Sequence, residues 1–264
     1  MLTFAGTPLK RIPCFIELTD YAERTRAGAF SPAVRTRKEH DAMIGEIVTR
    51  CFRPSPLRVF LRKKMPYGID PWNDVARLSK SRPVRVAFDV GANVGQTARA
   101  FVRYFPRAEV FSFEPVPDTF DILKRKTRRL RRVKVYRIAF GDGHRKEKMY
   151  IYGKASPFNS FVRDAPFMAY SPKPATTSDV EMVTIDSFSE ENGIHRIDLL
   201  KVDTEGFDIQ VLRGARMLFE KKAVGFVFFE FNEITPMDNA TGGVFLEMYE
   251  FLSGYGFRLV AIYT

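Results

Sequence analysis

From residue 84 to the end of the chain, apolar positions follow two alternating patterns. Short apolar runs, typical of buried strands, are separated by segments whose apolar residues recur every three or four positions, as on one face of a helix. Strands that alternate with helices at this spacing predict an α/β fold with an open, doubly wound, mostly parallel sheet. The predicted strands are 84–90, 109–113, 133–140, 147–152, 180–185, 197–202, 224–231 and 257–263, and the predicted helices are 94–104, 117–130, 209–219 and 245–252.

Residues 1–80 follow a different pattern, in which basic and apolar residues are interspersed with prolines. A helix is predicted over 39–52, and a second one starts with Asp70 as N-cap and Pro71 in the first helical position. We therefore expect residues 1–80 to form an N-terminal helical cap or extension on a main domain of residues 81–264.

The composition narrows the class of protein. The chain has 264 residues, of which 45% are hydrophobic, enough for one sizeable core. No apolar run approaches the length that spans a bilayer, and the first thirteen residues lack the apolar stretch of a secretory signal. The two cysteines, Cys14 and Cys51, argue against a disulfide framework, so we expect a cytoplasmic location. Two cysteines and three scattered histidines also argue against a zinc site, and we expect no metal ligands.

The net charge of +11 is concentrated in one segment. Residues 124–134 contain eight basic residues and no acidic one. Such a run suits RNA, an anionic membrane surface or an acidic substrate, but it also suits a solvated helix face. It lacks the interleaved aromatic residues that stack on single-stranded nucleic acid.

One predicted strand leads directly into a glycine-rich turn, in the segment Phe88-Asp89-Val90-Gly91-Ala92-Asn93-Val94-Gly95-Gln96. About 20 residues later, Glu114 and Pro115 follow the next strand. This combination predicts a nucleotide pocket at the carboxyl edge of a parallel sheet. The glycines allow the backbone to approach a ligand closely, and the acidic residue suits a ribose diol.

The glycine spacing favours S-adenosylmethionine (SAM) over a dinucleotide. Asn93 and Gln96 stand where a dinucleotide fold has its second and third glycines. SAM has no phosphate and carries a sulfonium cation, so an aspartate at position 89 is favourable near its cationic end. The alternative is a glycine turn that binds no ligand.

Carboxylates recur where the predicted strands end, at Asp89, Glu114, Asp142, Asp203 and Glu230. Because ligands of doubly wound sheets bind at the carboxyl ends of the strands, this edge is the predicted active site.

Asp203 is the first candidate for the catalytic base, with Glu205 and Glu230 as alternates. A carboxylate just after the predicted strand 197–202 can hold the methionine amino group of SAM, orient an acceptor hydroxyl or accept the proton of that hydroxyl. Glu205 and Asp208 can instead cap the next helix. The substrate candidates are Asn159 and Ser160, in the long loop 153–177, and Asn232, which follows the strand 224–231.

Several motifs in order resemble the FkbM family of SAM-dependent methyltransferases. The resemblance covers residues 67–264, and its matching segments are 89–95 (DVGANVG), 113–115 (FEP), 159–161 (NSF), 183–186 (VTID), 201–206 (KVDTEG) and 211–214 (VLRG).

The resemblance implies a class I, Rossmann-like methyltransferase fold over 81–264 and O-methylation of a hydroxyl on a sugar, glycan or natural product. By analogy, Gly91, Asn93 and Gly95 hold the methionine part of SAM, Glu114 holds the ribose and Asp142 lies on the adenine side. The class I sheet ends in an antiparallel hairpin, whereas this chain shows a single last strand. Its partner is absent, supplied by other residues, or missing from this chain.

Two other functions stay open. An RNA methyltransferase would use the basic run, although no amino-methylation motif of the N-P-P-Y type occurs. A non-catalytic partner-binding protein of the same fold would bind SAM weakly. We expect a small-molecule, sugar or lipid-linked glycan acceptor in preference to nucleic acid, and the oligomeric state stays open between monomer and homodimer.

Overall fold

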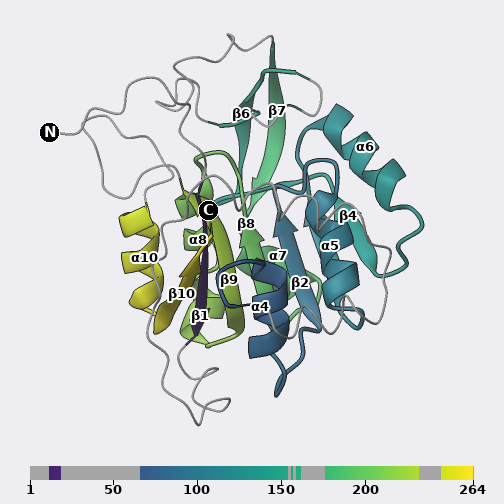
Figure 1. The fold of residues 1–264 in the computed structure, drawn as a ribbon. Coiled ribbons are helices and arrows are strands. Elements are labelled where there is room, and N and C mark those ends of the chain that lie inside the picture. The colour runs from purple at the N-terminus through teal and green to yellow at the C-terminus, as the bar shows by residue number, and fades with distance from the viewer. Residues whose placement is uncertain are drawn as a thin grey trace, which may run out of the picture.

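The computed structural model describes residues 12–18, 66–153, 156, 159–161, 176–231 and 245–263, and the statements below concern these residues. Their centre is a seven-stranded sheet (Figure 1). Its strands lie in the order β10 (Phe257–Ile262), β1 (Ile12–Leu18), β9 (Val224–Phe231), β8 (Ile197–Val202), β2 (Val86–Val90), β3 (Glu109–Phe113) and β4 (Val133–Tyr136).

The middle of this sheet is parallel and buried. β2 pairs in parallel with both β3 and β8, and β8 pairs in parallel with β9. The predicted strands 109–113, 197–202 and 224–231 match the observed ones residue for residue. They were predictable because strands that are covered on both faces are almost continuously apolar.

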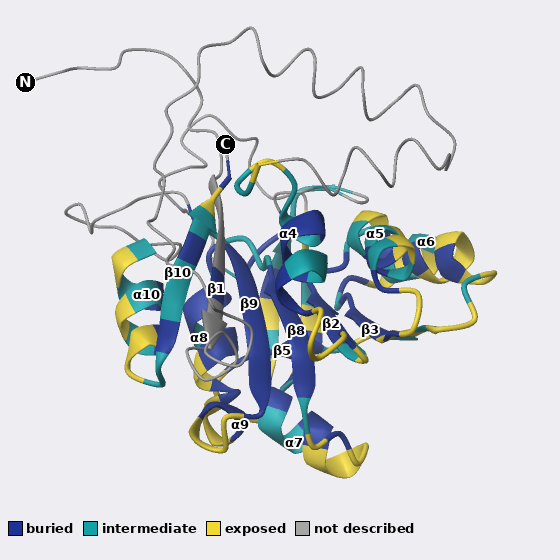
Figure 2. Cartoon of the chain, turned by 60° about the horizontal axis from the view of Figure 1, so that its bottom comes forward, coloured by how far each residue is buried: buried dark blue, intermediate teal, exposed yellow. Residues whose placement is uncertain are grey.

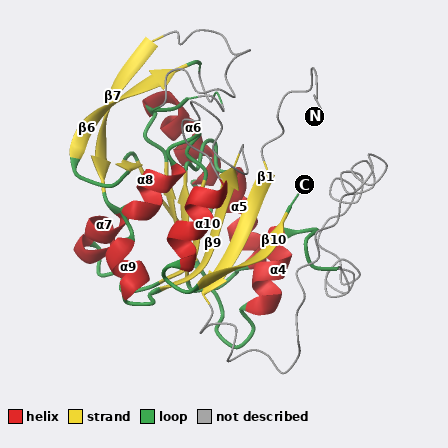
Figure 3. Cartoon of the chain, turned by 90° about the vertical axis from the view of Figure 1, so that its left-hand side faces the viewer, coloured by secondary structure: helices red, strands yellow, loops and turns green. Residues whose placement is uncertain are grey.

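Helices cover both faces of the sheet, as a doubly wound fold requires. Figure 3 shows α4 (Pro71–Leu78) and α5 (Gln96–Tyr104) on one face, and α7 (Ile185–Glu191), α8 (Asp208–Arg213) and α9 (Arg216–Glu220) on the other. α6 (Pro117–Thr127) contacts β4, and α10 (Phe245–Ser253) contacts β10. Figure 2 shows the buried residues gathered along the central strands between these helices. The predicted Rossmann-like α/β fold is therefore confirmed.

The start of α4 has the predicted cap. The Asp70 side chain accepts a hydrogen bond from the Asn73 amide at 3.0 Å, and Pro71 is the first helical residue. The hydroxyl of Tyr104 on α5 also donates to Asp70, so the same carboxylate joins the two helices.

The N-terminal strand β1 was not predicted. It lies between β9 and β10 and is antiparallel to both. β1 is therefore the antiparallel partner of the last strand. Of the alternatives for this partner, the structure shows the one in which residues from elsewhere in the chain supply it. Part of the region expected to be a helical cap thus belongs to the central sheet. The predicted helix 39–52 lies outside the described residues, and the predicted boundary at residue 80 stays a prediction.

Three other segments differ from expectation. The run 133–140 forms two strands, because β5 (Ala139–Phe140) leaves the main sheet to pair with β7 (Thr176–Val183), which in turn pairs with β6 (Arg145–Ile151). This second sheet extends above the main one in Figure 1. The predicted helix 209–219 is divided at Gly214, where the backbone packs so closely that a Cβ would lie 2.1 Å from the Gly141 carbonyl oxygen. Helix α7 was not predicted.

Where described, the chain has no helix that is both long enough and apolar enough to cross a bilayer.

Candidate active site

A cleft lies at the carboxyl edge of the sheet, where β2, β3 and β8 end. Its volume is about 630 Å³, counting the solvent at its mouth. Seven of the predicted site residues line it: Gly91, Asn93, Glu114, Pro115, Asn159, Asp203 and Glu205.

Gly91 brings the exits of β2 and β8 into contact. Its φ of +72° lies in the left-handed region, and a Cβ built at this position would lie 1.9 Å from the Asp203 carbonyl oxygen. The Asp203 amide also donates to the Val90 carbonyl at 3.2 Å. Only glycine satisfies both the conformation and the lack of space, so this residue fixes the distance between the glycine loop and Asp203.

The amides of the glycine loop are largely used within the protein. Those of Gly91 and Ala92 donate to the Phe113 carbonyl at 3.1 and 2.9 Å. The Asn93 amide donates to Glu114 at 3.0 Å, and the Gly95 amide donates to the Ala92 carbonyl at 2.8 Å. A pyrophosphate site needs such amides directed at the ligand. The loop therefore fits a ligand without phosphate.

Glu114 is 7% exposed and lines the cleft at the end of β3. Its Oε1 accepts from the Val116 amide and its Oε2 from the Asn93 amide, both at 3.0 Å. Burial raises the pKa of Glu114 to about 7, although the two amide hydrogen bonds lower it. Because each carboxylate oxygen can accept two hydrogen bonds, one acceptor position remains on each. Two adjacent positions of this kind suit the two hydroxyls of a ribose.

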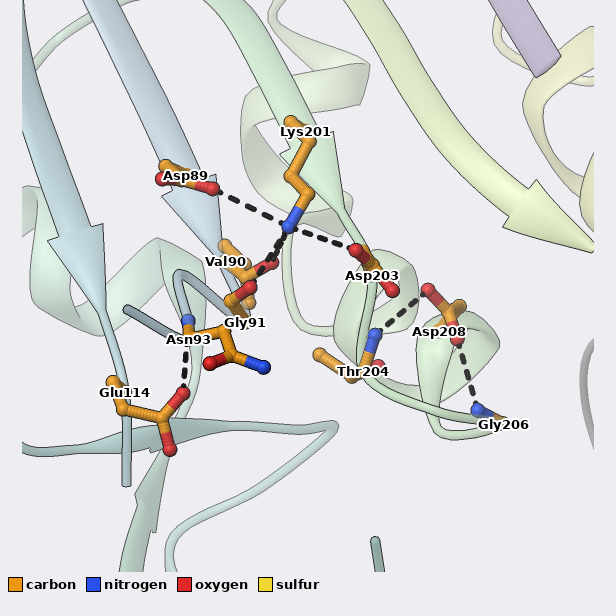
Figure 4. Close-up of polar contacts among 10 residues, drawn as sticks. All are labelled: Asp89, Val90, Gly91, Asn93, Glu114, Lys201, Asp203, Thr204, Gly206 and Asp208. Carbon is orange, nitrogen blue, oxygen red and sulfur yellow. Dashed lines mark hydrogen bonds and ion pairs between the residues drawn. The ribbon is translucent and has the colours of Figure 1, made fainter. Parts of the chain in front are cut away.

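A buried lysine lies between the exits of β2 and β8 (Figure 4). Lys201 Nζ lies 3.3 Å from Asp89 Oδ1 and 3.2 Å from Asp203 Oδ2. Burial by itself lowers the pKa of Lys201, but the Asp203 and Asp89 carboxylates outweigh it, so the pKa is raised. Burial also raises the pKa of Asp89, against the opposing effect of Lys201.

The turn after β8 is held by Asp208. Its carboxylate accepts from the amides of Thr204 at 3.2 Å and Gly206 at 3.3 Å, both of which precede α8. Asp208 therefore stabilises the turn and does not cap α8 as the alternative expected, because the N-cap position is Phe207 and no side chain caps it. Burial raises the pKa of Asp208 to about 6. Glu205 has a φ of +59°, and its carbonyl accepts from Ser160 Oγ at 2.6 Å. The hydroxyl of Ser160 is thus used to attach its loop to this turn.

The other predicted residues that the structure describes are not part of the cleft lining. Asp89 is fully buried against Lys201, and Gly95 is the N-cap residue of α5. Asp142 forms a surface ion pair of 2.8 Å with Arg145, whose hydrogen bond lowers the pKa of Asp142. Glu230 lies in β9 opposite Pro13 of β1. Asn232 lies outside the described residues.

Asn159 lines the cleft, but its amide group has partners in its own loop. Its Oδ1 accepts from the Tyr152 amide at 2.9 Å, and its Nδ2 donates to the Gly153 carbonyl at 3.1 Å. The predicted roles of all these residues in binding and catalysis stay predictions.

Sequence reasoning missed the apolar wall of the cleft, which consists of Phe113, Ile138, Phe140, Met149 and Phe161. Phe113 could have been suspected because it precedes Glu114. Phe161 could also have been suspected, because it follows the substrate candidates Asn159 and Ser160. Ile138, Phe140 and Met149 come from the second sheet and the segment before it, and no local pattern indicates that these segments meet the glycine loop.

Comparison with known proteins agrees with this geometry. The Methyltransferase FkbM domain matches residues 89–259. The 2-O-methyltransferase NoeI of Sinorhizobium fredii is 26% identical over 58% of this chain and 65% of its own length. The 31-O-demethyl-FK506 methyltransferase FkbM of Streptomyces tacrolimicus is 29% identical over 68% of this chain and 75% of its own. The hexuronic acid methyltransferase AglP of Haloferax volcanii is 29% identical over 62% of this chain and 64% of its own.

These matches span about two thirds of the length of the relatives. The family match spans more than half of the chain and includes the glycine loop, Glu114 and the turn after β8. The predicted family is confirmed: the chain belongs to the FkbM methyltransferase family.

Proposed function

We propose that the protein is a SAM-dependent O-methyltransferase that acts on a hydroxyl of a sugar, a glycan or a small natural product. The observation that carries the proposal is the cleft, in which Glu114 and the glycine loop meet with most loop amides already bonded internally. The class of acceptor is supported by the relatives, which are named for 2-O-methylation, for methylation of 31-O-demethyl-FK506 and for hexuronic acid methylation.

The cleft residues fit SAM in three respects. The remaining acceptor positions of Glu114 suit the ribose hydroxyls, and the apolar wall that includes Phe140 and Ile138 suits the adenine ring. The side chain of Asp203 is 34% exposed and supplies a carboxylate for a cationic part of the ligand. When bound, SAM supplies a methyl group already activated by its sulfonium.

The work left to the protein is to position the acceptor oxygen and to take up its proton. Asp203 is the proposed base, because it lines the cleft at the exit of β8. One of its oxygens, Oδ2, is held by Lys201, which fixes the orientation of the carboxylate. Glu205 also lines the cleft and is the first alternate base. Glu230 is the second alternate, and only its place near the end of β9 supports this role.

A methyl-transfer assay tests this function. The protein is incubated with methyl-labelled SAM and three acceptor classes: uronic-acid oligosaccharides, hydroxylated macrolactones and RNA. We expect alkali-stable label in one of the first two classes. Asp203→Asn should abolish the transfer even at saturating SAM, although the loss of its negative charge also weakens SAM binding. Label in RNA alone would contradict the proposed acceptor class, and undiminished transfer by Asp203→Asn would contradict the proposed base.

A further inference from the structure

Lys201 is in contact with four oxygen atoms that belong to two different strand exits. In addition to Asp89 and Asp203, its Nζ donates to the Val90 carbonyl at 3.1 Å and to the Gly91 carbonyl at 2.8 Å. Figure 4 shows the ammonium between the end of β2 and the end of β8. Burying a lysine is unfavourable unless its charge is paired, so this arrangement needs an explanation.

Neutralisation of Asp89 alone would explain only part of the arrangement. Asp89 and Lys201 are direct neighbours in the parallel pairing of β2 and β8, and one ion pair would balance their charges. The bonds to the two carbonyls add nothing to that balance. They attach the first residue of the glycine loop to the strand that carries Asp203.

The three charged side chains, Asp89, Lys201 and Asp203, also differ in how far they are exposed to the cleft. Two carboxylates and one ammonium leave an excess of one negative charge. The side chain of Asp89 is 0% exposed, that of Lys201 is 4% exposed and that of Asp203 is 34% exposed. Asp203 is the member of this group that lines the cleft, so the excess charge is presented there, by the oxygen that Lys201 does not hold.

We propose that Lys201 is a positioning residue, which fixes the glycine loop and the Asp203 carboxylate relative to each other, with Asp89 as its counter-ion. In this arrangement Asp89 does not contact the cofactor. One consequence of this inference rests on the proposed function: Lys201 would hold the methyl donor and the base in one geometry. The loop attachment itself can be measured without any ligand.

The test needs variants that separate positioning from the burial of charge. Lys201→Met alone leaves the buried Asp89 without its ammonium and should lower Tm, so it does not separate the two effects. Asp89→Asn combined with Lys201→Met removes one charge of each sign and retains the wild-type net charge, but it lacks the bonds to the two carbonyls. Leu200→Met is the matched control, because Leu200 is fully buried in the same strand and alternation directs its side chain to the opposite face.

Two measurements are made on the full chain. Hydrogen exchange of the amides of residues 91–95 is followed without ligand, with residues 109–113 of β3 as internal reference. SAM affinity is then measured by calorimetry. For the double variant we expect loop exchange and SAM Kd to rise about tenfold or more, the effect of losing a charged hydrogen bond, with little change in Tm or in β3 exchange. Leu200→Met should match wild type.

Wild-type loop exchange and SAM affinity in the double variant would overturn the proposal, because Lys201 would then only neutralise Asp89. Failure of the wild-type protein to bind SAM would instead refute the proposed function. The exchange measurement would still decide whether Lys201 positions the loop.

Discussion

Gly91 is the residue at which the glycine loop and the turn that carries Asp203 meet. Its left-handed φ and its contact with the Asp203 carbonyl are separate constraints. The first disfavours any side chain by about 1 kcal/mol, whereas the second requires the two strand exits to move apart. The geometry of the site therefore depends on the absence of a single methyl group.

We expect Gly91→Ala to lower SAM affinity by more than about tenfold and to lower Tm, because the new Cβ displaces the turn that carries Asp203. Gly193→Ala is the matched control. Gly193 also has a left-handed φ, of +64°, but no atom lies within 4 Å of its hypothetical Cβ. Calorimetry and thermal melts check both variants. If the two substitutions had equal effects, backbone strain alone would explain the loss of SAM affinity and Tm, and the close approach of Gly91 to the Asp203 carbonyl would not be needed.

At the same scale, the sequence predicted five carboxylates at the edge of the sheet, of which Glu114 and Asp203 line the cleft and Asp89, Asp142 and Glu230 do not. Asp89 and Asp203 both lie near strand ends, yet one is buried and the other lines the cleft. Asp89 lies within β2, whereas Asp203 follows the last residue of β8, and Lys201 contacts both because β2 pairs with β8. Strands 110 residues apart in sequence are involved, so no local pattern could reveal it.

At the scale of elements, β1 joins the last strand, β10, to the rest of the main sheet. Ile16 is fully buried and pairs with Val227 of β9 on one side and with Leu259 of β10 on the other. The strands of the main sheet with two buried faces could be predicted from their apolar runs. β1 could not, because a seven-residue strand so far in sequence from its partners carries no signal of where it inserts.

Ile16→Asp should therefore lower Tm by on the order of 10 °C, because it places a carboxylate in a buried position between two strands. Ile262→Asp is the control, since Ile262 lies in β10 but is 37% exposed. Its Tm should change by only a few degrees. Similar Tm values for Ile16→Asp and wild type, measured by calorimetry, would contradict the insertion of β1 into the sheet.

At the scale of the whole molecule, the basic run is separated from the proposed base Asp203 by two strands of the main sheet. The basic run extends from α6 to β4, whereas Asp203 follows β8. Two strands separate β8 from β4, so the two strands are about 14 Å apart at a spacing of about 4.8 Å. This exceeds the Debye length of about 8 Å at physiological salt. The exposed arginines are thus poorly placed to hold an acceptor beside Asp203.

We expect reversal of Arg128, Arg129, Arg131 and Arg132 to glutamate to change the acceptor KM by less than about threefold at 0.15 M salt. The measurement uses the acceptor found in the methyl-transfer assay. A large rise in KM would show that the acceptor reaches across the cleft to the basic run, as a phosphorylated, nucleotide-linked or lipid-linked acceptor would.

The central claim is that SAM binds in the cleft with Glu114 as the ribose partner, and its most direct test is calorimetric titration with SAM at pH 6 and pH 8. Because the pKa of Glu114 is raised to about 7, the carboxylate that accepts from the ribose is mostly present at pH 8 and mostly protonated at pH 6. We expect SAM affinity to be about tenfold weaker at pH 6. Glu114→Ala should bind SAM weakly at both pH values, and NAD should not bind. The account would be contradicted if SAM affinity changed neither with pH nor with the Glu114→Ala substitution, or if NAD bound as tightly as SAM.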